Sequence, residues 1–195
     1  MPTYGGGMEI FMLYMFLANG FEETEAIGCL DVLRRAEIDV KTVGVGGKEI
    51  TGSHGVCVRA DVCIDEISLE GLEGVILPGG MPGTTNLQAD ENVINAVKHC
   101  AKQGKLIAAI CAAPMILGQL GILEGRIAVC YPGFEEHLKG ARVDADAFVA
   151  IDGNVITGRG AGASMLFGAR IADWFKAGAG QEILDQMQHP LCENR

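Results

Sequence analysis

The chain has 195 residues, of which 49% are hydrophobic and 6% aromatic, and its formal net charge is −10. This length suits one domain with a large aliphatic core, and the sequence contains no internal repeat, low-complexity segment or visible domain boundary. The acidic balance and the lack of a basic stripe disfavour binding to nucleic acid or to acidic membrane surfaces.

The cysteines and the N-terminal region indicate a compartment. The seven cysteines form no CxxC pair and have no matching histidine spacing, so we expect neither a disulfide framework nor a structural metal site. Met8–Ala18 is apolar, but no Lys or Arg precedes it and no cleavage site follows, which favours a strand over a signal peptide or membrane span. We therefore predict a cytoplasmic protein with a flexible leader over residues 1–7 and a single domain over residues 8–195.

Strands and helices are predicted to alternate along the chain. The predicted strands are Ile10–Leu17, Val40–Val45, Gly74–Leu77, Leu106–Ile110, Arg126–Tyr131, Phe148–Ile151 and Val155–Thr157, with a short β excursion at Ile50–Ala60. The predicted helices are Phe21–Arg35, Asp90–Gln103, Pro114–Leu120, Met165–Lys176 and Gln181–Gln188. This order predicts an α/β fold, in which a mostly parallel sheet has helices on both faces.

The most informative stretch is Leu106–Leu120. Its first five residues have the length of a buried strand, Cys111 follows directly, and Pro114 suits the first turn of a helix. We therefore predict that Cys111 lies at a sharp strand-to-helix turn, as in a nucleophile elbow. The N-terminus of a helix favours a thiolate, which would make this cysteine reactive. The alternative is a small buried residue with a structural role only.

Other candidate residues lie at the carboxyl ends of the predicted strands, where open parallel sheets bind ligands. The glycine-rich loop Pro78–Gly83 brings backbone N–H groups close to a ligand. Glu22, Glu23 and Glu25 begin the helix after the first strand. A carboxyl group buried beside Cys111 would have a raised pKa and could move protons near neutral pH. Alternatively, all three carboxylates only complement the helix dipole.

The later glycine loop and the histidines are less informative. Gly158–Ala163 matches G-x-G-x-x-A, but the second half of a dinucleotide-binding unit does not follow, so we interpret it as a structural loop near the pocket. Arg159 in this loop could bind an anionic group. No position identifies a histidine base among His54, His99, His137 and His189.

Ala108–Pro114 resembles the elbow of the ThiJ/PfpI family, in the branch with the parkinsonism-associated deglycase and bacterial chaperones. Four further segments agree in order and spacing, namely residues 22–25, 34–36, 77–80 and 157–162. The similarity runs from the first strand to the helix with Trp174 and indicates a ThiJ/PfpI-like (class I glutamine amidotransferase-like) domain. It implies a flavodoxin-like three-layer sandwich and, as is usual in the family, a homodimer.

The resemblance also implies roles for individual residues. Cys111 matches the nucleophilic, easily oxidised cysteine of the family, and Glu25 matches the buried acid that hydrogen-bonds to it. The N–H groups of Gly80 and of the elbow, at Ala112, match an oxyanion pocket. Tyr131 stands where some relatives have histidine, and His54 stands where relatives often have arginine. The candidate pocket residues are Tyr131, His54, Arg159 and Gly79, and we expect no metal and no cofactor.

We predict a cofactor-free, cysteine-dependent enzyme that acts on small reactive dicarbonyls or their adducts, in the manner of a glyoxalase or deglycase. The alternative is a redox-sensing stress protein or chaperone with an oxidisable cysteine. A role in thiamine thiazole metabolism follows from the name of the family alone. Peptidase activity is not expected, because Ala112 stands where the protease-like branch has histidine.

Overall fold

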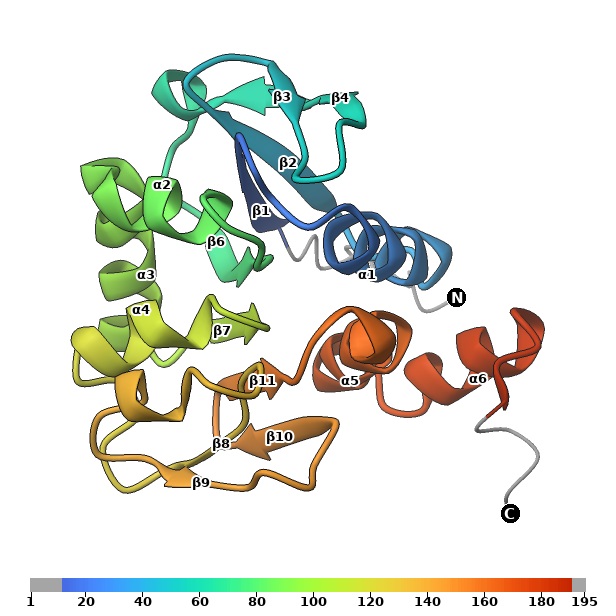
Figure 1. The fold of residues 1–195 in the computed structure, drawn as a ribbon. Coiled ribbons are helices and arrows are strands. Elements are labelled where there is room, and N and C mark those ends of the chain that lie inside the picture. The colour runs from blue at the N-terminus through green and yellow to red at the C-terminus, as the bar shows by residue number, and fades with distance from the viewer. Residues whose placement is uncertain (1–11, 191–195) are drawn as a thin grey trace, which may run out of the picture.

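The structure, a computed structural model, describes residues 12–190. Its centre is a seven-stranded sheet in the order β10-β11-β7-β6-β1-β2-β5 (Figure 1), in which β10 and β11 are antiparallel and all other neighbours are parallel. The strands are β1 (Met12–Ala18), β2 (Val40–Val45), β5 (Val62–Cys63), β6 (Leu72–Leu77), β7 (Leu106–Ile110), β10 (Val149–Asp152) and β11 (Val155–Gly158).

Helices cover both faces of this sheet, which confirms the predicted layered α/β architecture. In Figure 1, α1, α5 and α6 lie on one side of the strands and α2, α3 and α4 on the other. The helices are α1 (Glu23–Arg35), α2 (Gly83–Ala89), α3 (Glu91–Gln103), α4 (Pro114–Gln119), α5 (Ser164–Phe175) and α6 (Ala179–Gln186), with short 3-10 turns η1 (Ile64–Glu66), η2 (Glu135–His137) and η3 (Ala161–Ala163). Between residues 12 and 190, none of the helices has the length and apolar character needed to cross a bilayer.

The hydrophobic core is divided between the two faces, because successive side chains of a strand point in opposite directions. Leu13 and Met15 of β1 pack in the cluster that includes α1 and α5. Tyr14 and Phe16, which alternate with them, pack in the cluster that includes α3 and α4. A sheet buried on both faces is a rigid support, and it fixes the strand ends at which the candidate site lies.

The sequence did not predict α2, and the helix that it predicted from Asp90 is present as α3. The α2 segment has a weak sequence signal, since its two threonines and one asparagine are poor helix formers. Thr84 and Leu87 are buried in the structure, so tertiary packing stabilises this short helix.

The prediction of a strand over the whole of Arg126–Tyr131 was wrong. Only β8 (Ile127–Ala128) is a strand, and it pairs with β9 (Arg142–Val143) in a separate two-stranded sheet. After β8, the backbone no longer pairs with a strand in this segment. The Val129 N–H donates to the Thr157 hydroxyl, and the Tyr131 N–H donates to the Cys111 carbonyl.

Two further predictions concern the N-terminal half. The β excursion is present as a hairpin of β3 (Glu49–Thr51) and β4 (Cys57–Arg59). The first predicted strand corresponds to β1. The predicted leader over residues 1–7, and the start of that strand at Ile10, lie outside the described residues.

Candidate active site

Cys111 occupies the sharp turn between β7 and α4 that the sequence predicts. Its φ of +65° lies in the left-handed region, which costs a residue other than glycine roughly 1 kcal/mol or more. Two backbone hydrogen bonds hold this conformation. The Cys111 N–H donates to the Gly158 carbonyl and the Tyr131 N–H donates to the Cys111 carbonyl, both at 2.9 Å. Neighbouring segments therefore stabilise a strained turn that projects the sulfur at the end of the sheet.

Glu25 is the acid that the structure brings to this sulfur. It lies in the first turn of α1, its side chain is 1% exposed, and it is hydrogen-bonded to the Cys111 thiol. Its Oε2 also accepts a hydrogen bond from the Gly79 N–H at 2.9 Å. Glu22, by contrast, caps the helix, because its carboxylate accepts from the Glu25 N–H at 2.6 Å. The three neighbouring glutamates thus have different roles.

The two groups of the Cys111–Glu25 pair share a low-dielectric environment. Burial raises the pKa of Glu25 to about 7 and the negative charge of Glu22 adds to this, although hydrogen bonds from Cys111 and Gly79 lower it. Burial also raises the pKa of Cys111 to about 12, together with the charge and hydrogen bond of Glu25.

The raised pKa of Glu25 agrees with the expected buried acid, whereas the raised pKa of Cys111 differs from the expectation that the helix N-terminus makes it a thiolate. While Glu25 is ionised, the pair favours the thiol. The sulfur becomes a thiolate when its proton lies on Glu25, which removes the opposing charge. The N–H groups of Gly80 and Ala112 then stabilise the thiolate, because both hydrogen-bond to the sulfur and lower the pKa of Cys111.

The Gly79-Gly80 pair brings the backbone against the sulfur. A Cβ on Gly79 would lie 2.6 Å from the Cys111 Cβ and 2.7 Å from the Glu25 Oε2. Gly80 has φ +89°, which favours glycine. The N–H groups of Gly80 and Ala112 therefore converge beside the sulfur, where an oxyanion formed by attack of Cys111 would lie.

His54 is separate from this pair, on the loop between β3 and β4. Its side chain is 72% exposed, its Nδ1 lies 2.9 Å from the Glu23 carboxylate, and its N–H donates to Glu23 at 2.7 Å. The hydrogen bond to Glu23 raises the pKa of His54. Burial raises the pKa of Glu23, but the hydrogen bonds from His54 and nearby backbone outweigh this effect and lower it to about 2.

Potential metal ligands gather at one place within residues 12–190. Side-chain atoms of Glu22, Glu23 and His54 lie within 4.8 Å of one another. Glu22 already caps α1, and Glu23 already binds His54 and its loop. These hydrogen bonds account for the grouping without an ion.

A pocket of about 320 Å³ adjoins the elbow. It contains two of the four predicted pocket residues, Tyr131 and Arg159, and it does not include His54 or Gly79. Phe148, 59% exposed, forms another wall, and sequence reasoning missed it because it lies in a loop before β10 with no motif around it. The lining residues are Tyr131, Pro132, Phe148, Arg159, Gly160, Ala161, Gly162 and Ala163.

Comparisons with known proteins identify the family of this chain. Residues 12–173 match the model of the DJ-1/PfpI family. Protein dj-1beta of Drosophila melanogaster is 36% identical over 180 residues, which cover 91% of this chain and 94% of that protein. A protein named as a deglycase in Pyrococcus horikoshii is 33% identical over 150 residues, covering 76% of this chain and 90% of that protein. Protein DJ-1 homolog B of Arabidopsis thaliana is 36% identical over 177 residues, 90% of this chain, which spans only 40% of that longer relative.

Solved structures show the same fold. A DJ-1 superfamily protein from Salmonella typhimurium has a TM-score of 0.85 and 33% identity, over 92% of this chain and 99% of that one. Drosophila melanogaster DJ-1beta has a TM-score of 0.87 and 32% identity, over 91% of this chain and 97% of that one. The fold is thus the flavodoxin-like α/β fold of this superfamily, and the chain belongs to the DJ-1/PfpI family.

Proposed function

We propose that this chain is a cofactor-free enzyme that converts small α-oxoaldehydes, free or as adducts, into hydroxy acids. The observation that carries the proposal is the contact between the strained Cys111 and a buried Glu25 whose pKa is raised to about 7. A general base is most effective when its pKa lies near the working pH. The relatives named as deglycases support this class of substrate at the level of the family.

The reaction begins with addition of the Cys111 sulfur to the aldehyde carbon. Glu25 takes the thiol proton as the S–C bond forms, and the N–H groups of Gly80 and Ala112 stabilise the oxyanion. Glu25 then gives this proton to the oxyanion, which forms a hemithioacetal and leaves Glu25 ionised for the next step.

Glu25 next moves a proton between the two adjacent carbons. It removes the hydrogen of the former aldehyde carbon, which gives an enediol, and returns a proton to the neighbouring carbon, which gives a thioester. The aldehyde carbon is thereby oxidised and the ketone carbon is reduced within one molecule. Water hydrolyses the thioester, and the hydroxy acid and the Cys111 thiol are released.

The test uses methylglyoxal and measures lactate. We expect Cys111→Ser to abolish lactate formation and Glu25→Gln, which cannot accept the proton, to lower kcat/KM by about 100-fold or more. Cys57→Ser is the matched control, since Cys57 is an exposed cysteine on β4 without an acidic partner, and it should retain full turnover. Turnover by Cys111→Ser equal to that of the wild type would contradict the proposal.

One observation favours a second function as a redox sensor. Cys111 is partly accessible and has Glu25 beside it to accept its proton, so oxidation to sulfinic acid would be selective for this residue. Mass spectrometry after mild peroxide treatment tests this function. We expect Cys111 to be oxidised before Cys57, although Cys57 is more exposed, and equal oxidation of the two would exclude it.

A further inference from the structure

The pocket beside the elbow is larger than the proposed chemistry requires. Its volume of about 320 Å³ reaches the range, roughly 300–1,000 Å³, in which drug-sized ligands bind. A three-carbon dicarbonyl such as methylglyoxal would leave most of this space empty. The pocket therefore has room for a part of the substrate that does not react.

The backbone ties this pocket to the reacting sulfur. Tyr131, on one wall, donates its N–H to the Cys111 carbonyl, and Gly158, which precedes Arg159 in the chain, accepts from the Cys111 N–H. Gly158 is also paired with Ile110, the last residue before Cys111. The segments that carry Tyr131 and Arg159 are thus hydrogen-bonded to the backbone of Cys111, which places the pocket next to the elbow.

The walls are aromatic. Tyr131 is 51% exposed and Phe148 59% exposed. The Tyr131 ring packs on Gly160, where an added Cβ would lie 3.2 Å from the ring. Two accessible rings suit a flat group, because aromatic faces stack on planar ligands.

Arg159 gives the pocket a positive charge. Arg34, Arg35, Arg126 and Arg170 are each ion-paired with an aspartate, whereas the ion pairs within residues 12–190 involve none of Arg59, Arg142 and Arg159. Of these three arginines, Arg159 is the one that lines the pocket. A guanidinium group without an acidic partner, in a pocket, suits a carboxylate or phosphate, which it binds through two parallel hydrogen bonds.

We propose that this pocket selects substrates, so that the enzyme prefers α-oxoaldehydes whose distal part is a flat ring with a carboxylate or phosphate. This inference rests on the proposed function, since it names the substrate class of the same site. Arg159 is the specificity-determining residue, and Tyr131 and Phe148 hold the ring.

The experiment compares 4-carboxyphenylglyoxal with phenylglyoxal, which differ only in the carboxylate. Water and internal redox convert them to 4-carboxymandelate and mandelate. We expect kcat/KM to be at least about tenfold higher for the carboxylated substrate, the size of one charged hydrogen bond. In Arg159→Gln the two values should become about equal, and Arg159→Lys should keep part of the preference.

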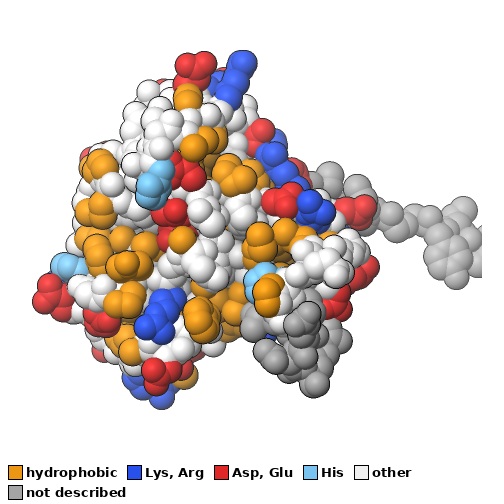
Figure 2. All heavy atoms as spheres, turned by 45° about the vertical axis from the view of Figure 1, so that its right-hand side comes forward, with side chains coloured by type: hydrophobic (Ala, Val, Ile, Leu, Met, Phe, Trp, Pro, Cys, Tyr) orange, Lys and Arg blue, Asp and Glu red, His pale blue; other side chains and the backbone are white. Residues whose placement is uncertain are grey.

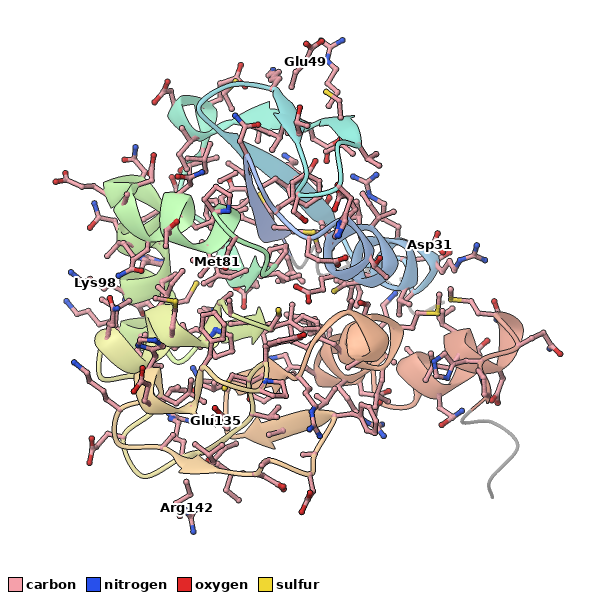
Figure 3. The ribbon with its side chains drawn as sticks, in the orientation of Figure 1. Asp31, Glu49, Met81, Lys98, Glu135 and Arg142 are labelled. Atoms are coloured by element: carbon pink, nitrogen blue, oxygen red, sulfur yellow. The ribbon has the colours of Figure 1, made fainter. Side chains whose placement is uncertain are left out.

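Arg142→Gln is the matched control, because Arg142 is an exposed arginine of β9 at the lower edge of the molecule in Figure 3, outside the pocket. It should keep the full preference. Because α-oxoaldehydes can react with arginine side chains, only initial rates are compared, and the intact mass of the protein is measured afterwards to check that no arginine has been modified. Equal kcat/KM for the two substrates in the wild type, or an unchanged preference in Arg159→Gln, would overturn the inference.

Binding of the products separates this inference from the proposed function. By calorimetry, 4-carboxymandelate should bind the wild type at least about tenfold more tightly than mandelate, and Arg159→Gln should lose this difference. If that binding preference is present but no α-oxoaldehyde is turned over, the proposed function fails and the pocket stands. If α-oxoaldehydes are turned over but the carboxylated compound is preferred neither in kcat/KM nor in binding, the inferred role of the pocket fails and the proposed function stands.

Discussion

At the scale of residues, the site depends on one buried carboxyl group. Glu25 is 1% exposed, and its pKa of about 7 lies well above the value of 4.5 for a free glutamate. The fold therefore disfavours the ionised form that acts as the base. Burial of this carboxyl group therefore lowers the free energy of unfolding when Glu25 is ionised, so the size of this effect depends on pH.

The first prediction concerns this effect. Because the pKa of Glu25 is higher in the folded than in the unfolded state, the folded state gains a proton relative to the unfolded state between pH 4.5 and 7, so its stability falls as the pH rises through this range. In Glu25→Gln this loss should disappear. Relative to the wild type, its free energy of unfolding should be higher at pH 8 by up to about 3 kcal/mol, and about equal at pH 4.5. Urea unfolding of both proteins at pH 8 and pH 4.5 measures these free energies. The same difference between variant and wild type at both pH values would contradict the raised pKa of Glu25.

The second prediction concerns the close contact at Gly79. In Gly79→Ala, the new Cβ would meet the Cys111 Cβ at 2.6 Å, so the sulfur or Glu25 must move. Displacement of a reacting group by about 1 Å costs roughly 100-fold in rate. We expect a fall of that size in kcat for methylglyoxal, while circular dichroism shows a folded protein. A variant with wild-type kcat would show that this contact does not position the reacting groups.

The residues of the site differ in how far the sequence alone predicts them. Cys111 was predicted from local signals, because an apolar strand, a cysteine and a proline follow one another in the nine residues Leu106–Pro114. Glu25 could be distinguished from Glu22 and Glu23 only through the family resemblance, because burial depends on how α1 packs. Phe148 reaches the pocket through the tertiary fold, and no local pattern indicates that.

At the scale of elements, some helices and strands follow from the local sequence pattern, and others depend on tertiary contacts. β7 and α3 were predicted almost to the residue because hydrophobic pattern, cap and terminal glycine agree. The Arg126–Tyr131 segment has an apolar pattern typical of a strand, but its hydrogen bonds go to Cys111 and Thr157. Its tertiary partners therefore override its pattern, at the place where it supports the elbow.

The third prediction concerns the cap of α3. The Asp90 carboxylate accepts hydrogen bonds from the N–H groups of Asn92 at 2.9 Å and Val93 at 3.2 Å. Asp90→Ala should lower the free energy of unfolding by about 1 kcal/mol. Because α3 packs against the sheet outside the candidate site, turnover of methylglyoxal should not change. Thermal and urea unfolding measure the effect, and an unchanged stability would mean that the cap contributes nothing.

At the scale of the whole molecule, the surface agrees with the composition. On the face shown in Figure 2, basic side chains are scattered between acidic ones and form no continuous stripe, while hydrophobic side chains reach the surface in several places. The net charge of −10 and this distribution disfavour a polyanionic partner. The cytoplasmic location stays a prediction.

The fourth prediction is the assembly state. The family resemblance implies a homodimer, and Ile27, Val56 and Trp174 are large apolar side chains that are 42%, 53% and 43% exposed in the single chain. We expect light scattering to give about twice the chain mass of 20.6 kDa at micromolar concentration. A mass of one chain under these conditions would contradict a stable homodimer.

The central claim is that Cys111 and Glu25 exchange one proton, and the rate of Cys111 alkylation against pH tests it most directly. Iodoacetamide labelling is quantified for each cysteine by mass spectrometry, with Cys57 as the reference in the same sample. In the wild type, the rate for Cys111 should rise with a midpoint near pH 7, where Glu25 ionises and can accept the thiol proton. In Glu25→Gln this midpoint should be absent, and the same profile in both proteins would contradict the account.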